Sequence, residues 1–364
     1  MEEKDSEPLL DHGLTRKMRT TIMFAALCSA IPTPAFAVDK LPEVSFQYKD
    51  WEIVCDNTRT CRAAGYTAED ATHRASVLLT RRAGPDQPLT GELQLADEGD
   101  QVSGSSNYQM SIGGWSVGKI LFDTKTGNAT LTGAQTEALV AALLRNSPVV
   151  WRAGKTTWTL STMGANAVFL KMDEFQGRLG TSGALIRKGS KSEAMVLPAL
   201  PPPVITAVIP PKSLPAVKLT SAQQTLLLAE LRKTTSVEDC ENLGPGAREK
   251  PSLATHPLTK DTMVVQMNCW MAAYNSGDGI WIANRHSPYA PRLVTDTATD
   301  YGDGEIFSSQ KGRGIGDCMG SDAWTWNGQA FIHTASSTTG MCREIAAGGT
   351  WDLPTIVTEV RKQH

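Results

Sequence analysis

Apolar and polar residues alternate along most of the chain, and this period of two is typical of strands with one buried face. Turn residues separate the alternating segments, which favours antiparallel sheets. In the first half the predicted strands are Phe46–Cys55, Cys61–Tyr66, Ser76–Thr80, Gly91–Leu95, Val149–Trp151, Thr156–Thr162 and Ala167–Leu170. In the second half the clearest predicted strands are Thr262–Ala273, Ile280–Ala283, Ala323–Trp326 and Gln329–Thr334.

Two segments carry a helical pattern instead. Each begins with a capping box, Thr132 with Gln135 and Thr220 with Gln223, in which the two side chains satisfy free backbone N–H groups at the start of a helix. Leucines at helical spacing follow each box: Leu139, Leu143 and Leu144 in the first segment, Leu227 and Leu231 in the second. The sequence therefore predicts one helix in each half of a β-rich chain.

A proline-rich segment over residues 196–217 separates the two halves. Proline removes backbone donors and favours the extended polyproline II conformation, so this segment is predicted to be a stiff linker. Its interspersed Val and Ile indicate that part of it packs against a domain. We predict an α+β fold with two β-rich, disulfide-stapled domains, residues 38–195 and 218–364, each with antiparallel sheets and one helix.

The first 37 residues are typical of a secretory signal peptide. The apolar run Ile22–Ile31 is followed by the small-residue site Ala35-Phe36-Ala37, so cleavage is predicted after Ala37. Because Met1–Lys17 is acidic where a leader should be basic, Met18 is the predicted true start. The apolar run is too short for a membrane-spanning helix, which needs about 20 residues. We expect a periplasmic protein without a stable membrane anchor.

Six cysteines remain after this leader, which fits an oxidising compartment. Fifteen pairings are possible, and nearest-neighbour order along the chain favours one of them. The predicted pairs are Cys55–Cys61, Cys240–Cys269 and Cys318–Cys342.

Metal binding is the alternative use of these cysteines. The chain has no C-x-x-C spacing and its histidines are scattered, which argues against zinc and against redox catalysis. An acidic turn formed by Asp296, Asp300, Asp303 and Glu305 could bind calcium, but its spacing does not fit an EF-hand loop, and a solvated loop is the favoured interpretation. We predict no metal and no cofactor.

Charge excludes one class of partner. The chain has 35 Lys and Arg against 38 Asp and Glu, and it contains no basic block. A nucleic-acid-binding face is therefore not expected.

Asn327-Gly328 is a strong hairpin signal. A two-residue loop at this position would place Trp326 opposite Gln329, Trp324 opposite Phe331 and Asp322 opposite His333. The second of these pairs is then a predicted core anchor.

Asp322 and His333 are the candidate catalytic residues. A carboxylate beside an imidazole orients the ring and raises its basicity, which suits general acid–base chemistry. The sequence places no nucleophile beside them, since Ser321 is expected on the opposite face. The favoured interpretation is a polar pair that closes the hairpin.

Several motifs are similar to those of an uncharacterised proteobacterial secreted family, domain of unknown function 1176, and more distantly to the invasion-associated locus B proteins. They are Asp50–Asn57 with Cys61–Tyr66, Lys311–Cys318, Trp324–Gly328, Cys342–Glu344 and Gly348–Thr355. The resemblance spans essentially the whole mature chain. It implies a periplasmic protein and supplies no catalytic residues.

We favour a cell-envelope binding or stress-related module with an unknown envelope protein or cell-wall ligand as its partner. Arg313, Asp317, Arg343 and Trp351 are the candidate binding residues. The alternatives are a periplasmic hydrolase, and an inhibitor of a wall-degrading enzyme that uses Gly312–Asp317 as a wedge. A deep pocket lined by the candidate charged residues would favour the enzyme, and a shallow groove bearing a tryptophan would favour binding.

Overall fold

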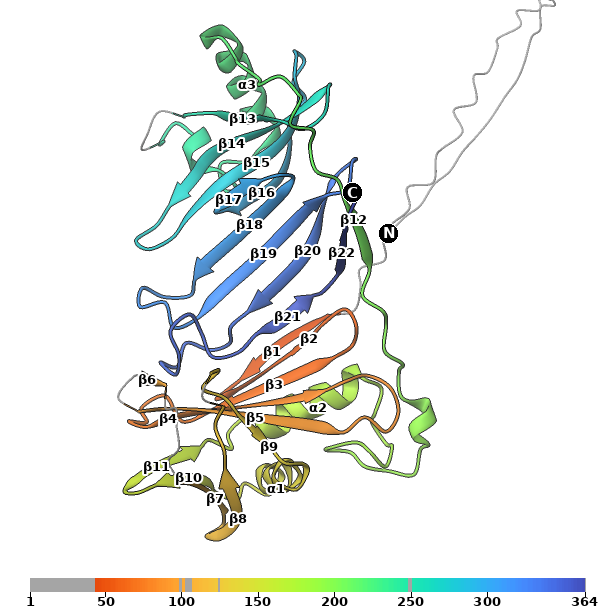
Figure 1. The fold of residues 1–364 in the computed structure, drawn as a ribbon, viewed down its shortest axis with the longest axis vertical. Helices are drawn as coiled ribbons and strands as arrows, with labels where there is room; N and C mark the ends of the chain where they lie inside the picture. Colours follow the sequence, from red (N-terminus) through yellow and green to blue (C-terminus); the bar gives the residue numbers. More distant parts are fainter. Residues whose placement is uncertain (1–42, 98–99, 102–106, 124, 248–250, 364) are drawn as a thin grey trace, which may run out of the picture. The chain divides into compact units, whose positions relative to one another are not determined.

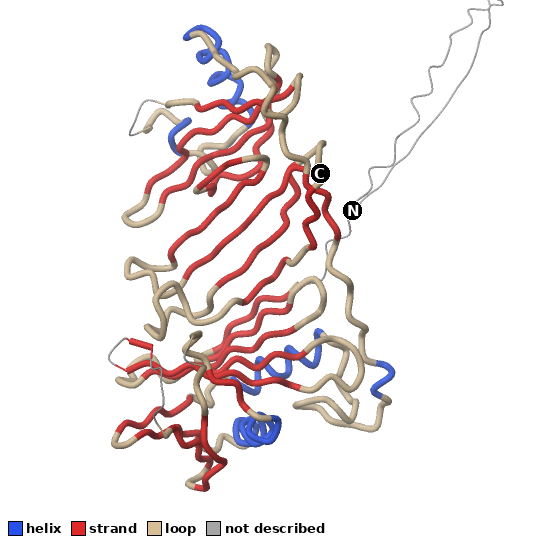
Figure 2. Tube along the Cα trace, viewed as in Figure 1, coloured by secondary structure: helices blue, strands red, loops and turns tan. Residues whose placement is uncertain are grey.

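The computed structural model describes residues 43–97, 100–101, 107–123, 125–247 and 251–363. Strands dominate over helices throughout these residues (Figure 2). The predicted leader, its cleavage site after Ala37 and the predicted start at Met18 lie outside the described residues. They stay predictions, as does the division into two domains.

The first half forms two antiparallel sheets (Figure 1). The larger sheet contains β1 (Val44–Tyr48), β2 (Trp51–Cys55), β3 (Cys61–Tyr66), β4 (Arg74–Arg81), β5 (Leu89–Asp97) and β6 (Asp100–Gln101), with β9 (Ala129–Leu131) paired to β5. The smaller has the order β11 (Thr156–Leu160), β10 (Val149–Ala153), β7 (Tyr108–Ile112) and β8 (Trp115–Ile120). The helices are α1 (Gly133–Leu144), α2 (Ala165–Phe175) and the short 3₁₀ helix η1 (Glu193–Met195).

The second half also forms two antiparallel sheets. One contains β13 (Ala254–Pro257), β14 (Thr262–Met271), β15 (Ser276–Asn284) and β16 (Arg292–Ala298). The other contains β17 (Asp300–Gly302), β18 (Glu305–Lys311), β19 (Met319–Trp326), β20 (Phe331–Thr338) and β21 (Leu353–Ile356). The helices here are α3 (Ser221–Thr234) and the 3₁₀ helix η2 (Glu241–Leu243).

Part of the proline-rich segment packs, as its apolar residues indicated. Its strand β12 (Val204–Ala207) pairs in parallel with the last strand, β22 (Glu359–Lys362). Just beyond β12, the Val208 N–H donates to the Trp326 carbonyl over 2.8 Å. The segment therefore lies against the sheet that contains β19.

Strands β2 to β5 of the larger sheet in the first half are covered on both faces. One face packs in a core with α1 and α2, where Trp51 on β2 meets Phe169 on α2 with ring centroids 5.5 Å apart. Gly65 lies opposite Trp51 on β3, and a Cβ at that position would collide with the indole ring. The other face packs against the segment between β20 and β21, with Met341, Ile345 and Trp351 in the cluster.

The three predicted disulfides are confirmed. Cys55–Cys61, Cys240–Cys269 and Cys318–Cys342 are all bonded. Both capping boxes are confirmed as well, with Thr132 and Thr220 as the N-caps of α1 and α3.

Two predicted strands are wrong. Ala167–Leu170 lies in α2, because the spacing of Val168, Phe169 and Met172 puts all three on the buried face of a helix. Phe46–Cys55 is two strands, since Lys49 takes the left-handed conformation at φ 57° and turns the chain back on itself. Short apolar runs are compatible with either structure, and tertiary packing decides between them.

Candidate functional site

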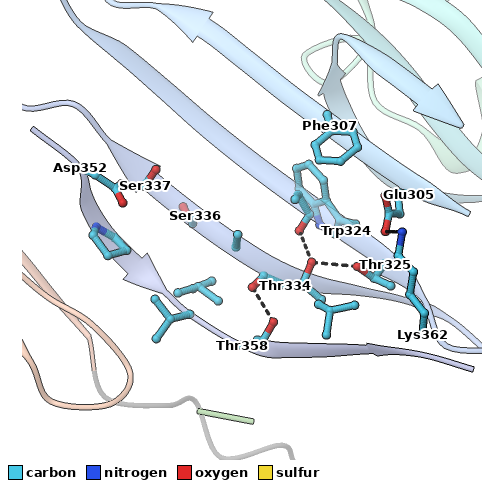
Figure 3. Close-up of a pocket in the computed structure, with 16 residues that line it drawn as sticks. Glu305, Phe307, Trp324, Thr325, Thr334, Ser336, Ser337, Asp352, Thr358 and Lys362 are labelled. Carbon is cyan, nitrogen blue, oxygen red and sulfur yellow. Dashed lines mark hydrogen bonds and ion pairs between the residues drawn. The ribbon is translucent and has the colours of Figure 1, made fainter. Parts of the chain in front are cut away.

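The sheet β17–β21 carries a shallow groove of about 440 Å³. Figure 3 shows its walls, which come from β18, β19, β20, β21 and the C-terminal strand. The lining residues are Glu305, Phe307, Ala323, Trp324, Thr325, Thr334, Ala335, Ser336, Ser337, Asp352, Pro354, Ile356, Val357, Thr358, Val360 and Lys362. We call this site the hydroxyl groove, because many of these side chains end in a hydroxyl group.

Alternation along β18 creates the groove. Ile306 is fully buried in the core between the two sheets of the second half. Its neighbour Phe307 belongs to the opposite face, as strand geometry requires, and is 46% exposed. Exposed large apolar side chains at a groove are typical of ligand contacts.

The hydroxyl groups in the centre are bonded to one another. The Thr325 and Thr334 hydroxyls lie 3.1 Å apart, and Thr334 also donates to the Ala323 carbonyl over 3.1 Å. The Thr358 hydroxyl donates to the Thr334 carbonyl over 2.9 Å (Figure 3). Thr325 and Thr334 are each only 4% exposed, so their hydroxyls form the floor of the groove. The half-buried hydroxyls of Ser336, Ser337 and Thr358 are the ones that a ligand can reach.

Charged groups lie at the two ends of the groove. At one end Lys362 Nζ is 3.9 Å from Glu305 Oε1. At the other end lies Asp352, an exposed carboxylate (Figure 3). The groove therefore offers hydroxyls, two acids, one amine and an aromatic ring along one path.

Asp322 and His333 are in direct contact. His333 Nε2 lies 2.8 Å from Asp322 Oδ1, and the imidazole stacks on the Trp324 indole with centroids 4.7 Å apart and 13° between the planes. Burial of Asp322 opposes its ionisation, but hydrogen bonds from His333 and Ser336 hold the pKa of this carboxyl below its usual value. The predicted contact is thus confirmed.

The predicted hairpin register is wrong. Trp326 lies opposite Phe331, Trp324 opposite His333, and Asp322 opposite Ser336. Asn327 explains the difference, because its side-chain oxygen accepts from the N–H groups of Gln329 and Ala330 and lengthens the loop. A bulge next to Trp324 then brings Asp322 back beside His333. The Trp324–Phe331 anchor does not form, and Trp326 pairs with Phe331 instead.

Arg313 and Asp317 bind each other. Arg313 donates from Nε and Nη2 to the two carboxylate oxygens of Asp317 over 2.7 and 2.6 Å. Its Nη2 also lies 3.2 Å from Glu344 Oε1, and Arg74 on β4 is 3.6 Å from the other oxygen of Glu344. The hydrogen bonds from Arg313 hold the pKa of Asp317 below its usual value.

Arg343 and Trp351 contact the first sheet. Arg343 donates to Asp50 Oδ1 over 2.9 Å, and its guanidinium lies 6.0 Å from the centre of the Tyr66 ring. Trp351 donates from Nε1 to the Ser76 hydroxyl over 2.7 Å. Both side chains are buried, and their contacts attach the C-terminal segment to the sheet.

A buried acid lies at the same contact. Glu52 Oε1 accepts from the Tyr66 hydroxyl over 2.6 Å and from the Met341 N–H over 2.8 Å. Burial raises the pKa of Glu52 in spite of these hydrogen bonds. Burial also raises the pKa of Tyr66 well above its usual value.

The candidate charged residues do not line one deep pocket. Arg313, Asp317 and Arg343 lie around the contact with the first sheet, whereas His333 lies beside Trp324 on the hairpin. The hydroxyl groove is shallow and Trp324 is among its lining residues, but the Trp324 indole lies on the core face of the sheet with its cross-strand partner Ile306. A ligand-binding role for Arg313, Asp317, Arg343 and Trp351 stays a prediction, as does a wedge at Gly312–Asp317, where Ile315 is 68% exposed.

A family model described as a protein of unknown function, DUF1176, matches residues 45–358. The chain belongs to the DUF1176 family. It is also 26% identical over 315 residues to the uncharacterized protein YpfG of Escherichia coli strain K12, covering 78% of this chain and 84% of that protein. No solved structure matches. The first predicted resemblance is confirmed, and the more distant likeness to locus B proteins stays a prediction.

Two further features of this DUF1176 chain concern membranes and metals. Among the described residues no helix is long and apolar enough to cross a membrane. Within the same residues the one cluster with metal-ligand spacing is Asp317, Cys318 and Cys342, and its two sulfur atoms are joined in a disulfide.

The hydroxyl groove was not predicted from the sequence. One signal could have indicated it: the run Thr334–Thr339 is rich in hydroxyl residues where a half-buried strand should carry alternating apolar ones. Such a run indicates a strand with an open polar face. The contribution of Glu305, Lys362 and Phe307 could not be read in this way, because it depends on strand pairing.

Proposed function

We propose that this protein is a binding module of the bacterial cell envelope and that the hydroxyl groove holds a glycan strand of the cell wall. The observation that carries the proposal is the groove itself, in which the exposed Phe307 ring lies along a row of hydroxyl groups on an open sheet face. Sugars present apolar C–H faces and polar hydroxyl edges, so an aromatic ring with a row of hydrogen-bonding groups is complementary to them.

The distribution of polar groups supports a glycan over an apolar ligand. Thr325, Thr334 and Thr358 form the centre, and the acids Glu305 and Asp352 flank them. Carboxylates accept hydrogen bonds from neutral hydroxyl groups without needing a charged partner. A neutral or weakly charged polyhydroxylated ligand therefore fits better than a strongly anionic one.

Location and chemistry support binding in the periplasm. Three disulfides fit an oxidising compartment, which the predicted leader would deliver the chain to. Among the described residues, the imidazole of His333 has its hydrogen bond with Asp322 and none with a serine, threonine or cysteine side chain. An activated nucleophile normally lies within hydrogen-bond reach of its base, so this arrangement favours binding over hydrolysis.

Calorimetric titration of the mature protein with a soluble tetramer of N-acetylglucosamine tests the proposal. We expect saturable binding that Phe307→Ala weakens by up to about tenfold, since aromatic contacts contribute about 0.5–1.5 kcal/mol beyond buried area. Tyr274→Ala is the matched control, because Tyr274 is 45% exposed and Phe307 is 46% exposed. The control should bind like the unmodified protein.

Mass spectrometry of the same sample distinguishes binding from catalysis. An intact tetramer after long incubation supports the binding module. If shorter sugars form with the unmodified protein but not with His333→Asn, the protein is a hydrolase and the binding proposal is wrong. If the Phe307→Ala and Tyr274→Ala variants bind the tetramer with equal affinity, the glycan does not bind in the hydroxyl groove.

A further inference from the structure

A second cavity of about 350 Å³ lies where the two sheets of the second half face each other. Ile282, Leu293 and Val294 come from β15 and β16, and Trp324, Phe331 and His333 come from β19 and β20. Arg292 and Ala330 complete the lining. We call this cavity the slot, since an aliphatic wall faces an aromatic one.

The slot is the open end of a hydrophobic core. Ile280, Ile306 and Trp326 are buried between the same two sheets. Val294, Trp324 and Phe331 pack against this core but remain only partly buried. Apolar side chains that continue a core into an open cavity are typical of a site that an apolar ligand fills.

One charge lines the slot without a partner. Arg292 is exposed, and its guanidinium has no hydrogen bond or ion pair with any of the described residues. None of the described side chains that line the slot carries a carboxylate. Charge complementarity therefore favours a ligand with an anionic head, and a carboxylate matches the planar fork of an arginine.

The aromatic wall is held in place. The hydrogen bond of 2.8 Å to the Asp322 carboxylate fixes the His333 ring, which stacks on the Trp324 indole. Asp322 is thus a positioning residue that acts through His333. Two stacked rings present a flat apolar surface, against which an alkyl chain or a flat ring can pack.

We propose that the slot binds a small apolar carboxylate, with its apolar body between the two walls and its carboxylate paired with Arg292. This site is separate from the hydroxyl groove, although Trp324 borders both. Its ligand class is a fatty acid or a similar amphiphilic acid, and not a glycan.

Titration calorimetry with decanoate and decanol tests the proposal, because the two probes share their apolar chain and differ in the head group. We expect one decanoate per chain and at least roughly tenfold weaker binding of decanol, since an alcohol cannot form the charge-assisted hydrogen bonds that a carboxylate forms with Arg292. Arg292→Met should weaken decanoate binding to the level of decanol and leave decanol binding unchanged. Arg82→Met, another exposed arginine, is the matched control and should change neither.

The position of the bound probe is tested by fluorine NMR on protein labelled with 5-fluorotryptophan, in which Trp324→Phe assigns the Trp324 resonance. Decanoate should shift this resonance, and Ala330→Leu should reduce the affinity by filling the slot. The same titration on Phe307→Ala should be unchanged, so failure of the glycan site and failure of the slot are distinguishable. Equal affinity for decanol and decanoate, or decanoate binding that Arg292→Met leaves intact, would overturn the proposal.

Discussion

The two central sheets of this protein differ in how many of their faces are buried. Strands β2 to β5 bury most of their residues on both faces, because α1 and α2 cover one face and the segment around Trp351 covers the other. Strands β18 to β20 mix buried, half-buried and exposed positions, with a core on one face and the hydroxyl groove on the other.

This difference indicates which sheet maintains the fold and which sheet can bind a ligand. Side chains on a doubly covered sheet are fixed by packing, and changing their volume creates a cavity or a collision. Side chains on an open face are free of that constraint and can contact a ligand. The first sheet is therefore the structural scaffold, and the sheet β17–β21 is the one with a face that is free to contact a ligand.

Replacing Trp51 with alanine should give the largest effect. The ring is fully buried, contacts Phe169, and donates from Nε1 to the Ser161 carbonyl over 2.8 Å. We expect the free energy of unfolding to fall by about 3–5 kcal/mol, the usual range for a buried aromatic residue. Urea unfolding followed by circular dichroism measures it.

Phe307→Ala on the open sheet provides the contrast for Trp51→Ala. It should change the free energy of unfolding by about 0.5 kcal/mol or less, as for most surface positions. Similar losses for the two variants would contradict the division into scaffold and open surface.

Removing disulfides should give the next largest effect, with an order set by loop length. The Cys318–Cys342 bond closes a separation of 24 residues and Cys55–Cys61 one of 6. On the chain-entropy model their loss costs about 3.5 and about 2 kcal/mol. Paired Cys→Ala variants, compared by urea midpoint, measure both values. If loss of Cys55–Cys61 lowers the free energy of unfolding more than loss of Cys318–Cys342, packing of the first disulfide in its sheet outweighs chain entropy.

Much of the fold follows from local signals. Thr132 and Thr220 cap the two helices where their capping boxes predicted them, and nearest-neighbour order predicted all three disulfides. A capping box involves residues only a few positions apart, and the disulfide pairing follows the order of the cysteines along the chain. Helix α2 was missed because its apolar residues fit a strand until Phe169 is seen against Trp51.

The roles of the candidate binding residues could not be predicted, because their partners are distant in the sequence. Arg343 pairs with Asp50 across 293 positions, and Trp351 bonds to Ser76 across 275. A charged residue beside glycines has the same local pattern whether it binds a ligand or its own chain. The Asp322–His333 contact was predicted because both residues belong to one hairpin.

Apart from the contrast variant Phe307→Ala, the smallest expected effect is a pH dependence at Asp317, at the edge of the contact between the C-terminal segment and the first sheet. Hydrogen bonds from Arg313 lower the pKa of Asp317 in the folded state, whereas the unfolded chain keeps a value of about 3.9. The carboxylate therefore stabilises the fold above the unfolded value, and this contribution is lost as pH falls through the folded pKa. Because the Arg313 side chain is 40% exposed, solvent screening limits the effect to about 1 kcal/mol.

Comparing the unmodified protein with Asp317→Asn by urea unfolding between pH 7 and pH 3 isolates this contribution. The difference in free energy of unfolding should be largest near pH 7 and should shrink as the pH falls below about 4. Arg313→Met should reproduce the loss, because it removes the same two hydrogen bonds. The bonds from Arg313 and from the Glu344 N–H all end on the Asp317 carboxylate. A difference that stays constant across the range would therefore show that the charge of Asp317 does not contribute, and the contact would then owe its stability to packing around Trp351.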